Sequence, residues 1–405
     1  MTSPAAPNPH AIPWRLVALA GALTALAPMA IDMYLPALPT IQRAFASTPE
    51  AARATLGAFL IGLACGQFLY GPTSDRIGRR APLLAGMVLY LASTVACVFA
   101  PSIEWMIAAR FLQALGGSAG QVLARASIRD RFDHQTSARV LSALMLVMGM
   151  APMLAPLVGG WLLFFGWRAI FVAQAVIGGA ICLWALIMFD ETHSPEKAAI
   201  SRGEAVWRSY AAMLRQPRLI GYILAGAFNG GALFAYIAAA PSLLIEIYKI
   251  PPDRFGWVFL VNSGGMIAMS QVNTHLLRWR TPEDILSKAR LVSILFAGAL
   301  AAAAFTGFGG MWSVLAALFL TIATFGMVGP NTQAAGLSVD LTRTGAISSL
   351  MGASTFAVGA GVSVLTGVFH DGTPRPLAVI ILVSILLSSA ALYGLARPFR
   401  TAAGA

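Results

Sequence analysis

Charged side chains are scarce in this chain, because Asp, Glu, Lys and Arg together make up only 11% of its 405 residues. A soluble domain carries roughly 25% of them, so water is excluded as the solvent for most of this chain. Cysteine is also rare, and Cys65, Cys97 and Cys182 all fall within apolar segments. Three thiols within apolar segments offer neither a disulfide framework nor a metal cluster.

Two further absences bear on catalysis. The histidines are all in tails, loops or the ends of apolar segments, at His10, His134, His193, His275 and His370. This placement excludes a Ser-His or histidine-rich metal site in the middle of an apolar segment. A phosphate-binding G-x-x-x-x-G-K-[ST] loop is missing from the sequence, so ATP is not the direct energy source. We therefore predict that the protein is not an enzyme, holds no metal and uses no cofactor.

Long apolar segments dominate what is present: 58% of the residues are hydrophobic, and the mean hydropathy is +0.75. A helix needs about 20 apolar residues to cross a bilayer. About twelve segments reach that length, at approximately residues 15–36, 54–73, 81–100, 104–124, 139–164, 168–189, 219–244, 256–277, 290–308, 311–334, 344–369 and 377–396. The sequence therefore predicts an all-α integral membrane protein with 12 transmembrane helices.

The net charge of +11 could suggest a nucleic-acid partner, but its distribution indicates topology. If the N-terminus is cytoplasmic, most Lys and Arg residues fall in the inner connections, as the positive-inside rule requires. We therefore predict that the protein has no nucleic-acid partner. We also predict that it is a multi-pass protein in the lipid bilayer of the cell inner (plasma) membrane, with both termini cytoplasmic. Residues 1–14 show no cleavable signal pattern, so we expect them to be retained.

The longest polar stretch, residues 190–218, divides the predicted spans into two groups of six. It is predicted to be a cytoplasmic linker with an amphipathic surface helix around Glu204–Leu214. The predicted organisation is a tail at 1–14, a six-helix bundle at 15–189, the linker at 190–218, a second six-helix bundle at 219–396 and a tail at 397–405.

A charged loop, residues 71–80, separates the second and third predicted spans and reads Gly71-Pro72-Thr73-Ser74-Asp75-Arg76-Ile77-Gly78-Arg79-Arg80. It resembles the G-x-L-x-D-R-x-G-R-[RK] signature of the major facilitator superfamily. Its glycines permit a tight turn, and its arginines favour the cytoplasmic side. The resemblance implies two pseudo-symmetric bundles with a midplane site. It also implies a conformational gate formed by Gly71, Asp75, Arg76, Gly78, Arg79 and Arg80. The alternative is a charged hairpin with no further role.

Three more passages strengthen the resemblance. Residues 110–117 resemble the superfamily's R-x-x-Q-G-x-G motif, with Ala114 in place of the first glycine. Residues 155–160 resemble the G-P-x-x-G-G motif of antiporters through Pro156, Gly159 and Gly160, with alanine in the leading position. Residues 31–39 resemble the first span of the Bcr/CflA group of drug and proton antiporters. The resemblance implies a monomer that exports amphipathic, drug-like small molecules in exchange for protons.

Asp32 is the one acidic residue, of sixteen, that lies inside a predicted span, and the others fall at membrane edges or in loops. An intramembrane carboxylate costs several kcal/mol unless it is protonated, paired or hydrated, so it is a candidate functional group. We predict that Asp32 takes up and releases the coupled proton. The alternative is a structural carboxylate held in a permanent ion pair.

Arg110 is the one basic residue in the middle of a predicted span. At about 1.5 Å per residue, Asp32 lies about 25 Å above the cytoplasmic edge and Arg110 about 10 Å below the outer edge. Both therefore lie in the outer half of the membrane. We hypothesise that they form a proton-coupling pair that opens when Asp32 is protonated.

Aromatic and amide side chains within the spans are candidates for a mostly apolar substrate cavity with a few polar anchors. They are Tyr34, Gln113, Asn229, Phe234, Tyr236, Asn262, Asn331 and Gln333. Ordinary packing is the alternative for each of them. For the whole protein, the alternatives are an exporter of a sugar, amino acid or other metabolite, and an uncoupled facilitator.

Overall fold

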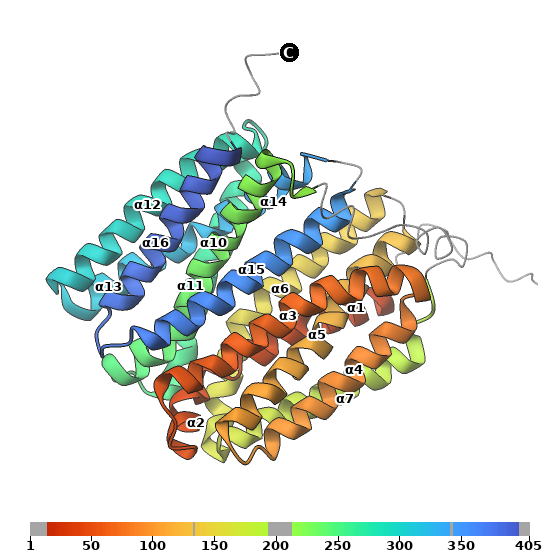
Figure 1. The fold of residues 1–405 in the computed structure, drawn as a ribbon, viewed down its shortest axis with the longest axis horizontal. Coiled ribbons are helices and arrows are strands. Elements are labelled where there is room, and N and C mark those ends of the chain that lie inside the picture. The colour runs from red at the N-terminus through yellow and green to blue at the C-terminus, as the bar shows by residue number, and fades with distance from the viewer. Residues whose placement is uncertain (1–13, 133, 193–212, 341–342, 397–405) are drawn as a thin grey trace, which may run out of the picture.

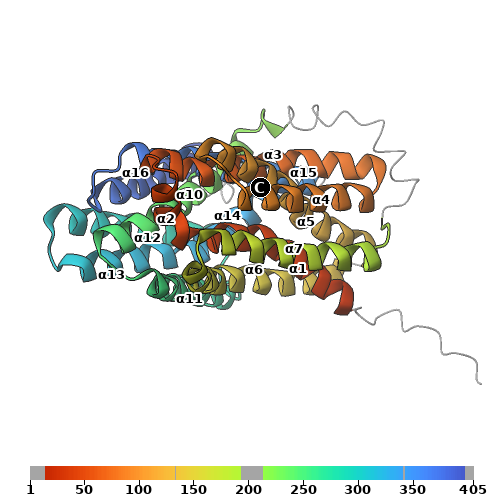
Figure 2. The ribbon, with the colours of Figure 1, turned by 90° about the horizontal axis from the view of Figure 1, so that it is seen from below.

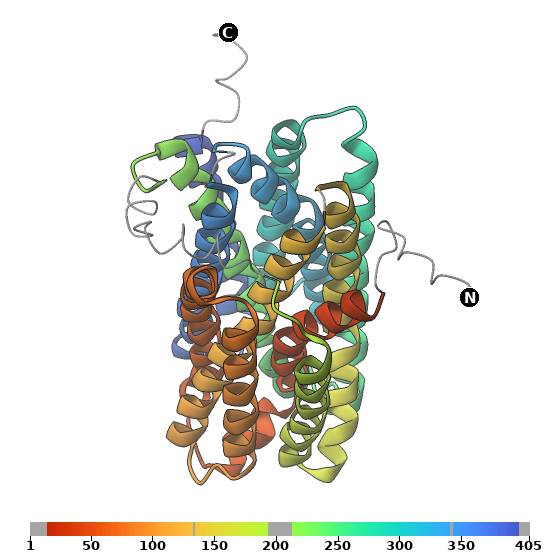
Figure 3. The ribbon, with the colours of Figure 1, turned by 90° about the vertical axis from the view of Figure 1, so that its right-hand side faces the viewer.

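The computed structural model of the protein describes residues 14–132, 134–192, 213–340 and 343–396. Every regular element within these ranges is a helix, and the long helices run roughly parallel to one another (Figures 1 and 3). Two predicted regions lie almost entirely outside the described residues. One is the pair of terminal tails, of which only Trp14 is described. The other is the predicted surface helix around 204–214, of which only the last two residues are described.

The first six predicted spans each coincide with a long helix. These are α1 (Trp14–Asp32), α3 (Pro49–Ile77), α4 (Arg80–Val98), α5 (Ile103–Arg131), α6 (His134–Leu162) and α7 (Trp167–Met188). Short elements lie between them, namely η1 (Leu35–Ala37), α2 (Leu38–Ala44) and η2 (Leu163–Phe165). We call α1 to α7 the N-terminal half.

The last six predicted spans also coincide with helices, and three of them consist of two consecutive helical elements. They are α10 (Pro217–Pro241) with η3 (Ser242–Ile247), α11 (Pro252–Leu276), α12 (Pro282–Thr306), α13 (Gly310–Ala323) with α14 (Phe325–Leu337), α15 (Thr344–Val368), and α16 (Arg375–Ala391) with η5 (Leu392–Ala396). We call α10 to η5 the C-terminal half.

Nine helical segments of the described chain are long and apolar enough to cross a membrane by length and composition. The other three predicted spans correspond to α5, α6 and α11, which have 29, 29 and 25 residues. At about 1.5 Å per residue each of these is also long enough to cross a bilayer.

The two halves lie side by side, with α12, α13 and α16 on one flank and α4, α5 and α7 on the other (Figure 2). Two helix pairs join them: α3 packs along α15, and α6 packs along α11. Gly57 of α3 faces Val364 of α15, and Gly160 of α6 faces the Pro252 carbonyl of α11. These two crossings bring the halves into contact.

The bundle has two ends. The signature end carries residues 71–80, where α3 finishes and α4 begins, and the opposite end carries α2 and the connection from α15 to α16. Two of the helices that begin at the opposite end have a side-chain hydroxyl group as their N-cap. Thr48 accepts a hydrogen bond from the Ala51 N–H before α3, and Ser102 accepts one from Trp105 before α5.

The α-helix of the first span ends at Asp32, before the predicted boundary at residue 36. Pro36 has no backbone N–H and cannot donate to the carbonyl of Asp32, which lies four residues earlier. The chain continues through a turn into η1 and α2. Asp32 therefore lies where the regular helix stops, toward the opposite end of the bundle.

Candidate functional site

Asp32 is the buried carboxylate of the described chain, with 4% of its surface exposed. No hydrogen bond or ion pair joins it to another described residue. Tyr236 on α10, in the other half, lies close enough to Asp32 to interact with it electrostatically. Asp32 thus faces the boundary between the halves without a counter-ion among the described residues.

Tyr236 belongs to a small polar and aromatic cluster on the C-terminal side of this boundary. Asn262 of α11 donates a hydrogen bond to the Tyr236 hydroxyl at 2.8 Å. The Tyr236 ring stacks on Phe259 at 5.0 Å between centroids, and Phe259 packs against Phe255 at 4.9 Å. Because the Tyr236 oxygen accepts from Asn262, its own proton remains available for another acceptor.

Arg110 is fully buried on α5, inside the N-terminal half. Its Nη1 donates to the Ala30 carbonyl at 3.1 Å and to Gln113 Oε1 at 2.7 Å. Its guanidinium lies over the rings of Tyr34 and Phe59, at 4.5 and 4.1 Å from their centroids. Aromatic faces attract a cation, so they stabilise the charge here in place of a carboxylate.

Gln113 extends this polar cluster between three helices. Its Nε2 donates to Thr94 Oγ1 of α4 at 2.9 Å and to Gln174 Oε1 of α7 at 3.0 Å. The Tyr34 hydroxyl shares a 2.7 Å hydrogen bond with Thr55 of α3. Tyr34 and Gln113, both predicted to line a substrate cavity, therefore surround Arg110 within the N-terminal half.

Asp32 and Arg110 form no ion pair in this structure, contrary to the pair expected from their equal depth. Successive residues of a helix are rotated by about 100°, so Asp32 and Ala30, which accepts from Arg110, lie on nearly opposite sides of α1. Asp32 faces Tyr236 in the other half, whereas Arg110 stays among residues of its own half. Equal depth in the membrane is not sufficient for contact.

The glycines of residues 155–160 lie where three helices meet. A Cβ at Gly159 would overlap the carbonyl oxygen of Met33, just after α1, and a Cβ at Gly160 would lie 2.9 Å from the Pro252 carbonyl of α11. Pro156 is buried on the same helix. This part of α6 therefore lies at the boundary between the two halves, and the close packing leaves no space for a larger side chain at Gly159.

The signature loop is organised around Arg79, which is 6% exposed. Its Nε donates to Asp130 Oδ2 at 2.9 Å, and its Nη1 pairs with Asp75 Oδ1 and donates to Ser74 Oγ. Asp130 comes from the end of α5, so Arg79 ties α3, α4 and α5 together. Gly78 ends α3 with φ of +96°, a conformation that favours glycine.

Glu191, which the sequence did not single out, caps the start of α4. Its Oε1 accepts from the Arg79 N–H at 2.8 Å and its Oε2 from the Arg80 N–H at 3.1 Å. A carboxylate is favoured at a helix N-terminus. Arg76 and Arg80 are exposed, Asp75 is partly exposed, and Gly71 lies near Ser349 of α15.

The remaining cavity candidates fall at separate places. Asn229 accepts a hydrogen bond from Arg290 at 3.2 Å, Phe234 packs on Phe356 of α15, and Asn331 donates to Asn273 of α11. Gln333 is exposed and forms no hydrogen bond with a described residue. Asp32, Tyr236 and Asn262 therefore form the one group of candidates that spans the boundary between the halves.

Two buried arginines were missed from the sequence because they lie near span ends. Arg290 is fully buried on α12, and Arg53 is 4% exposed on α3. Nε and Nη2 of Arg290 have no hydrogen-bond partner among the described residues. The one signal in the sequence was an arginine within a few residues of a long apolar run.

Comparison with known proteins now identifies the family. The model of the major facilitator superfamily matches residues 20–366. The chain belongs to this superfamily. It is 32% identical over 385 residues to the MFS-type transporter YdgK of Bacillus subtilis (strain 168), covering 94% of this chain and 95% of that one.

A second relative is named for drug resistance. The chain is 30% identical over 386 residues to a bicyclomycin resistance protein homolog of Haemophilus influenzae (strain ATCC 51907 / DSM 11121 / KW20 / Rd), covering 92% of this chain and 94% of the relative. The resemblance to the Bcr/CflA group, first seen in residues 31–39, is thereby confirmed.

Among solved structures, a D-xylose-proton symporter superposes with a TM-score of 0.74 at 15% identity, covering 93% of this chain and 97% of that one. At this identity the match establishes the fold alone. The major facilitator fold with 12 transmembrane helices, expected from the sequence, is confirmed. The protein is a multi-span membrane transporter of small molecules and not an enzyme.

Proposed function

We propose that this protein exports amphipathic, drug-like molecules across the cell inner membrane in exchange for protons, by alternating access. The observation that carries the proposal is Asp32: it is buried, faces Tyr236 of the other half and has no counter-ion among the described residues. A carboxylate in such a place is stable when protonated and costly when charged. It can therefore bind a proton in one state of the protein and release it in another.

The surroundings of Asp32 support an apolar or amphipathic substrate. Phe255, Phe259 and Tyr236 provide aromatic surface, and Asn262 and the Asp32 carboxyl provide a few polar anchors. Such a mixture suits molecules that are mainly apolar with a few polar groups. The similarity to a bicyclomycin resistance protein homolog agrees with this class, and bicyclomycin is the first compound to test.

Topology and energy supply follow from the same proposal. The signature end would face the cytoplasm, because its arginines belong on the positive side of the membrane. Gly71, Asp75, Arg76, Gly78, Arg79 and Arg80 would form the cytoplasmic gate. The proton gradient would drive transport, and the protein would work as a monomer without a cofactor. The Pro156–Gly160 segment would seal the boundary between the halves against proton leak while the halves move.

The proposal is tested by export in a bacterial host that lacks its own drug pumps. Wild-type protein should raise resistance to bicyclomycin or to another amphipathic antibiotic of a panel, and an imposed pH gradient should drive uptake of that compound into everted vesicles. Asp32→Asn should lower this gradient-driven transport at least about tenfold, because asparagine cannot release a proton. Asp284→Asn, in an exposed ion pair on α12, is the matched control and should transport normally.

Three results would contradict the proposal. Gradient-driven transport by Asp32→Asn at the wild-type rate would remove Asp32 from coupling. Wild-type transport that ignores the pH gradient would indicate an uncoupled facilitator. Transport of a sugar or an amino acid, without activity toward any antibiotic of the panel, would indicate a metabolite exporter.

A further inference from the structure

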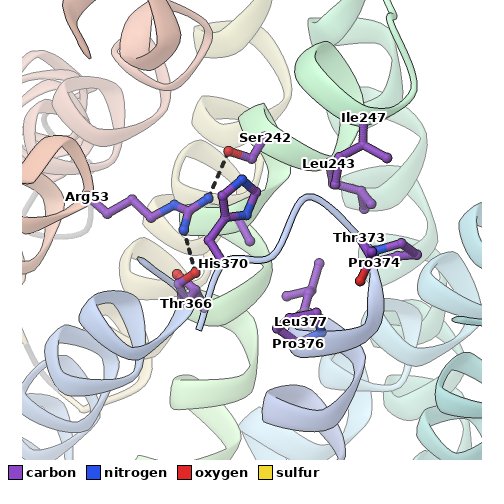
Figure 4. A pocket seen from close by; sticks show the side chains of 11 residues that line it. Arg53, Ser242, Leu243, Ile247, Thr366, His370, Thr373, Pro374, Pro376 and Leu377 are labelled. Atoms are coloured by element: carbon purple, nitrogen blue, oxygen red, sulfur yellow. Dashed lines mark hydrogen bonds between the residues drawn. The ribbon is translucent and has the colours of Figure 1, made fainter. Parts of the chain in front are cut away.

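Arg53 connects the two halves at the opposite end of the bundle (Figure 4). Its Nη1 donates to the backbone carbonyl of Thr366, in the last turn of α15. Its Nη2 donates to Ser242 Oγ at 2.8 Å, at the start of η3. Arg53 belongs to the N-terminal half and both acceptors belong to the C-terminal half, so one side chain bridges them.

The acceptors of Arg53 are neutral. Ser242 passes the interaction on by donating to Glu246 Oε2 at 2.7 Å, while Glu50 and Glu246 act on the guanidinium only through longer-range electrostatics. Each of these hydrogen bonds has one charged partner, so it contributes more than a hydrogen bond between neutral groups, but breaking it leaves no carboxylate without its counter-ion. The bridge is therefore strong enough to bias the two halves together and weak enough to break during a transport cycle.

His370 lies beside this bridge, two residues after the end of α15. Arg53, Ser242, Thr366 and His370 line the same small pocket, and Figure 4 shows the imidazole next to the guanidinium. The charged groups that act on His370 are Glu50 and Arg53 from α3, Glu246 from η3, and Asp371 from its own loop. Arg53 is the one cation of this set.

We propose that Arg53 and His370 form a pH-sensitive latch that closes the opposite end of the transporter. While His370 is neutral, the Arg53 bridge holds α3 against α15 and η3. When His370 is protonated, a second positive charge lies beside the guanidinium, and like charges at short distance repel. The closed arrangement is then weakened and the opposite end opens.

The direction of the pH effect follows from linkage. Burial and the neighbouring Arg53 lower the pKa of His370 below its ordinary 6.5 in the closed arrangement. In an open arrangement His370 gains water and loses Arg53, so its pKa returns toward that value. The open state therefore binds more protons, and lowering the pH through the range below about 6.5 shifts the population toward it. Above that range His370 is neutral in both states, and pH has no effect through this group.

The latch rests on the alternating access proposed above, but not on the substrate or on Asp32. If the opposite end faces the cell exterior, an acidic exterior would open the side from which the coupled protons enter. Because opening is measurable without any substrate or proton gradient, a failure of the latch and a failure of the drug-export proposal can be told apart.

The test measures opening through a cysteine placed in the cavity wall. The three native cysteines are replaced by alanine in the full-length protein, Ala239→Cys is introduced beside Arg53, and the protein is reconstituted in liposomes. The rate of reaction with a membrane-impermeant maleimide is divided by the rate for the unfolded protein at the same pH, which removes the intrinsic pH dependence of the thiol.

In the otherwise wild-type protein, we expect the normalised rate to rise about fivefold between roughly pH 7.5 and 5.5. Arg53→Gln should react fast at both pH values, and Arg53→Lys, which keeps the charge but loses the two-pronged geometry, should fall in between. His370→Gln should react slowly at both pH values. His275→Gln is the matched control, because His275 is at the signature end and its loss should leave the pH response intact.

Two results would overturn the latch. The first is Arg53→Gln labelled as slowly as the wild-type protein near pH 7.5. The second is a full pH response in His370→Gln. The second measurement does not depend on whether an Arg53 variant folds, because it uses His370→Gln, and His370 is partly exposed in the connection that follows α15.

Discussion

Arg79 at the signature end and Arg53 at the opposite end are almost equally buried, at 6% and 4% exposed, but their partners differ. Arg79 is paired with two carboxylates, Asp75 and Asp130, and all three residues belong to the N-terminal half. Arg53 donates to a backbone carbonyl and a hydroxyl, both in the C-terminal half. Arg79 is therefore held by carboxylates of its own half, whereas Arg53 is held by neutral acceptors of the other half.

This difference matches what each contact must do in a protein whose halves move relative to each other. Breaking a buried ion pair leaves an uncompensated charge and costs several kcal/mol, so the contacts of Arg79 favour a half that moves as one body. Hydrogen bonds from an arginine to neutral acceptors cost less to exchange for water, because no second charge is left without a counter-ion. The contacts that must open in every cycle are therefore expected to be of the kind that Arg53 makes.

The largest effect is expected for Arg79→Met. The substitution removes the cation between Asp75 and Asp130 and leaves two carboxylates close together, so the free energy of unfolding should fall by about 3 kcal/mol. The measurement is a denaturant titration in mixed detergent micelles. Arg280→Met is the matched control: Arg280 pairs with Asp284 on the surface, and its loss should change stability by less than about 0.5 kcal/mol.

Equal losses for Arg79→Met and Arg280→Met would remove the basis of the comparison. Arg79 would then be one more solvated arginine of the signature end, and the N-terminal half would not depend on its charge network for rigidity.

The fold itself was predictable from the sequence. In a bilayer every long apolar segment has to satisfy its backbone internally, so each of the twelve segments had to be a helix, and each coincides with one or two helices of the structure. The first span was expected to end near residue 36; its regular α-helix ends at Asp32, because Pro36 cannot donate to the carbonyl of Asp32, and the helical segment continues to Ala44. The fixed spacing of the signature also singled out Gly78 and Arg79, and their role in a conformational gate stays a prediction.

The contacts of the site were less predictable. Depth along a helix follows from counting residues, but the direction in which a side chain points depends on how the helices are rotated against each other. Asp32 and Arg110 were therefore placed at the same height and expected to meet, but they form no ion pair in this structure, and their role in proton coupling stays a prediction. Arg290 lies only about 12 Å along α12 from its start, and nothing in the sequence shows that neighbouring helices cover it there.

A smaller effect is expected for Gly78→Ala, which sharpens the account of the signature end. At φ of +96° and ψ of 167°, alanine costs about 1–3 kcal/mol, and its Cβ would press against the Glu191 carboxylate. We expect a loss of about 2 kcal/mol in the same titration, with faster hydrogen exchange at the start of α4. Gly372→Ala, also at positive φ but with open space around it, is the control for backbone strain alone. If both variants lose the same stability, the Glu191 cap contributes nothing.

The smallest change in the free energy of unfolding is expected for Arg290→Met. This substitution tests whether a buried arginine contributes to stability when it is not paired with a carboxylate. Arg290 is fully buried like Arg110, and among the described residues its one hydrogen bond goes to Asn229. Methionine has a similar length and no buried charge, so the cost of desolvating the guanidinium disappears while about one hydrogen bond is lost. We therefore expect a change within about 1 kcal/mol, in either direction. Arg290→Lys, which keeps a charge but cannot reproduce the planar guanidinium, should be the less stable of the two variants. If Arg290→Met is as destabilising as Arg79→Met, burial alone decides how an arginine contributes in this protein, and the distinction between its charge-paired and neutral-bonded arginines fails.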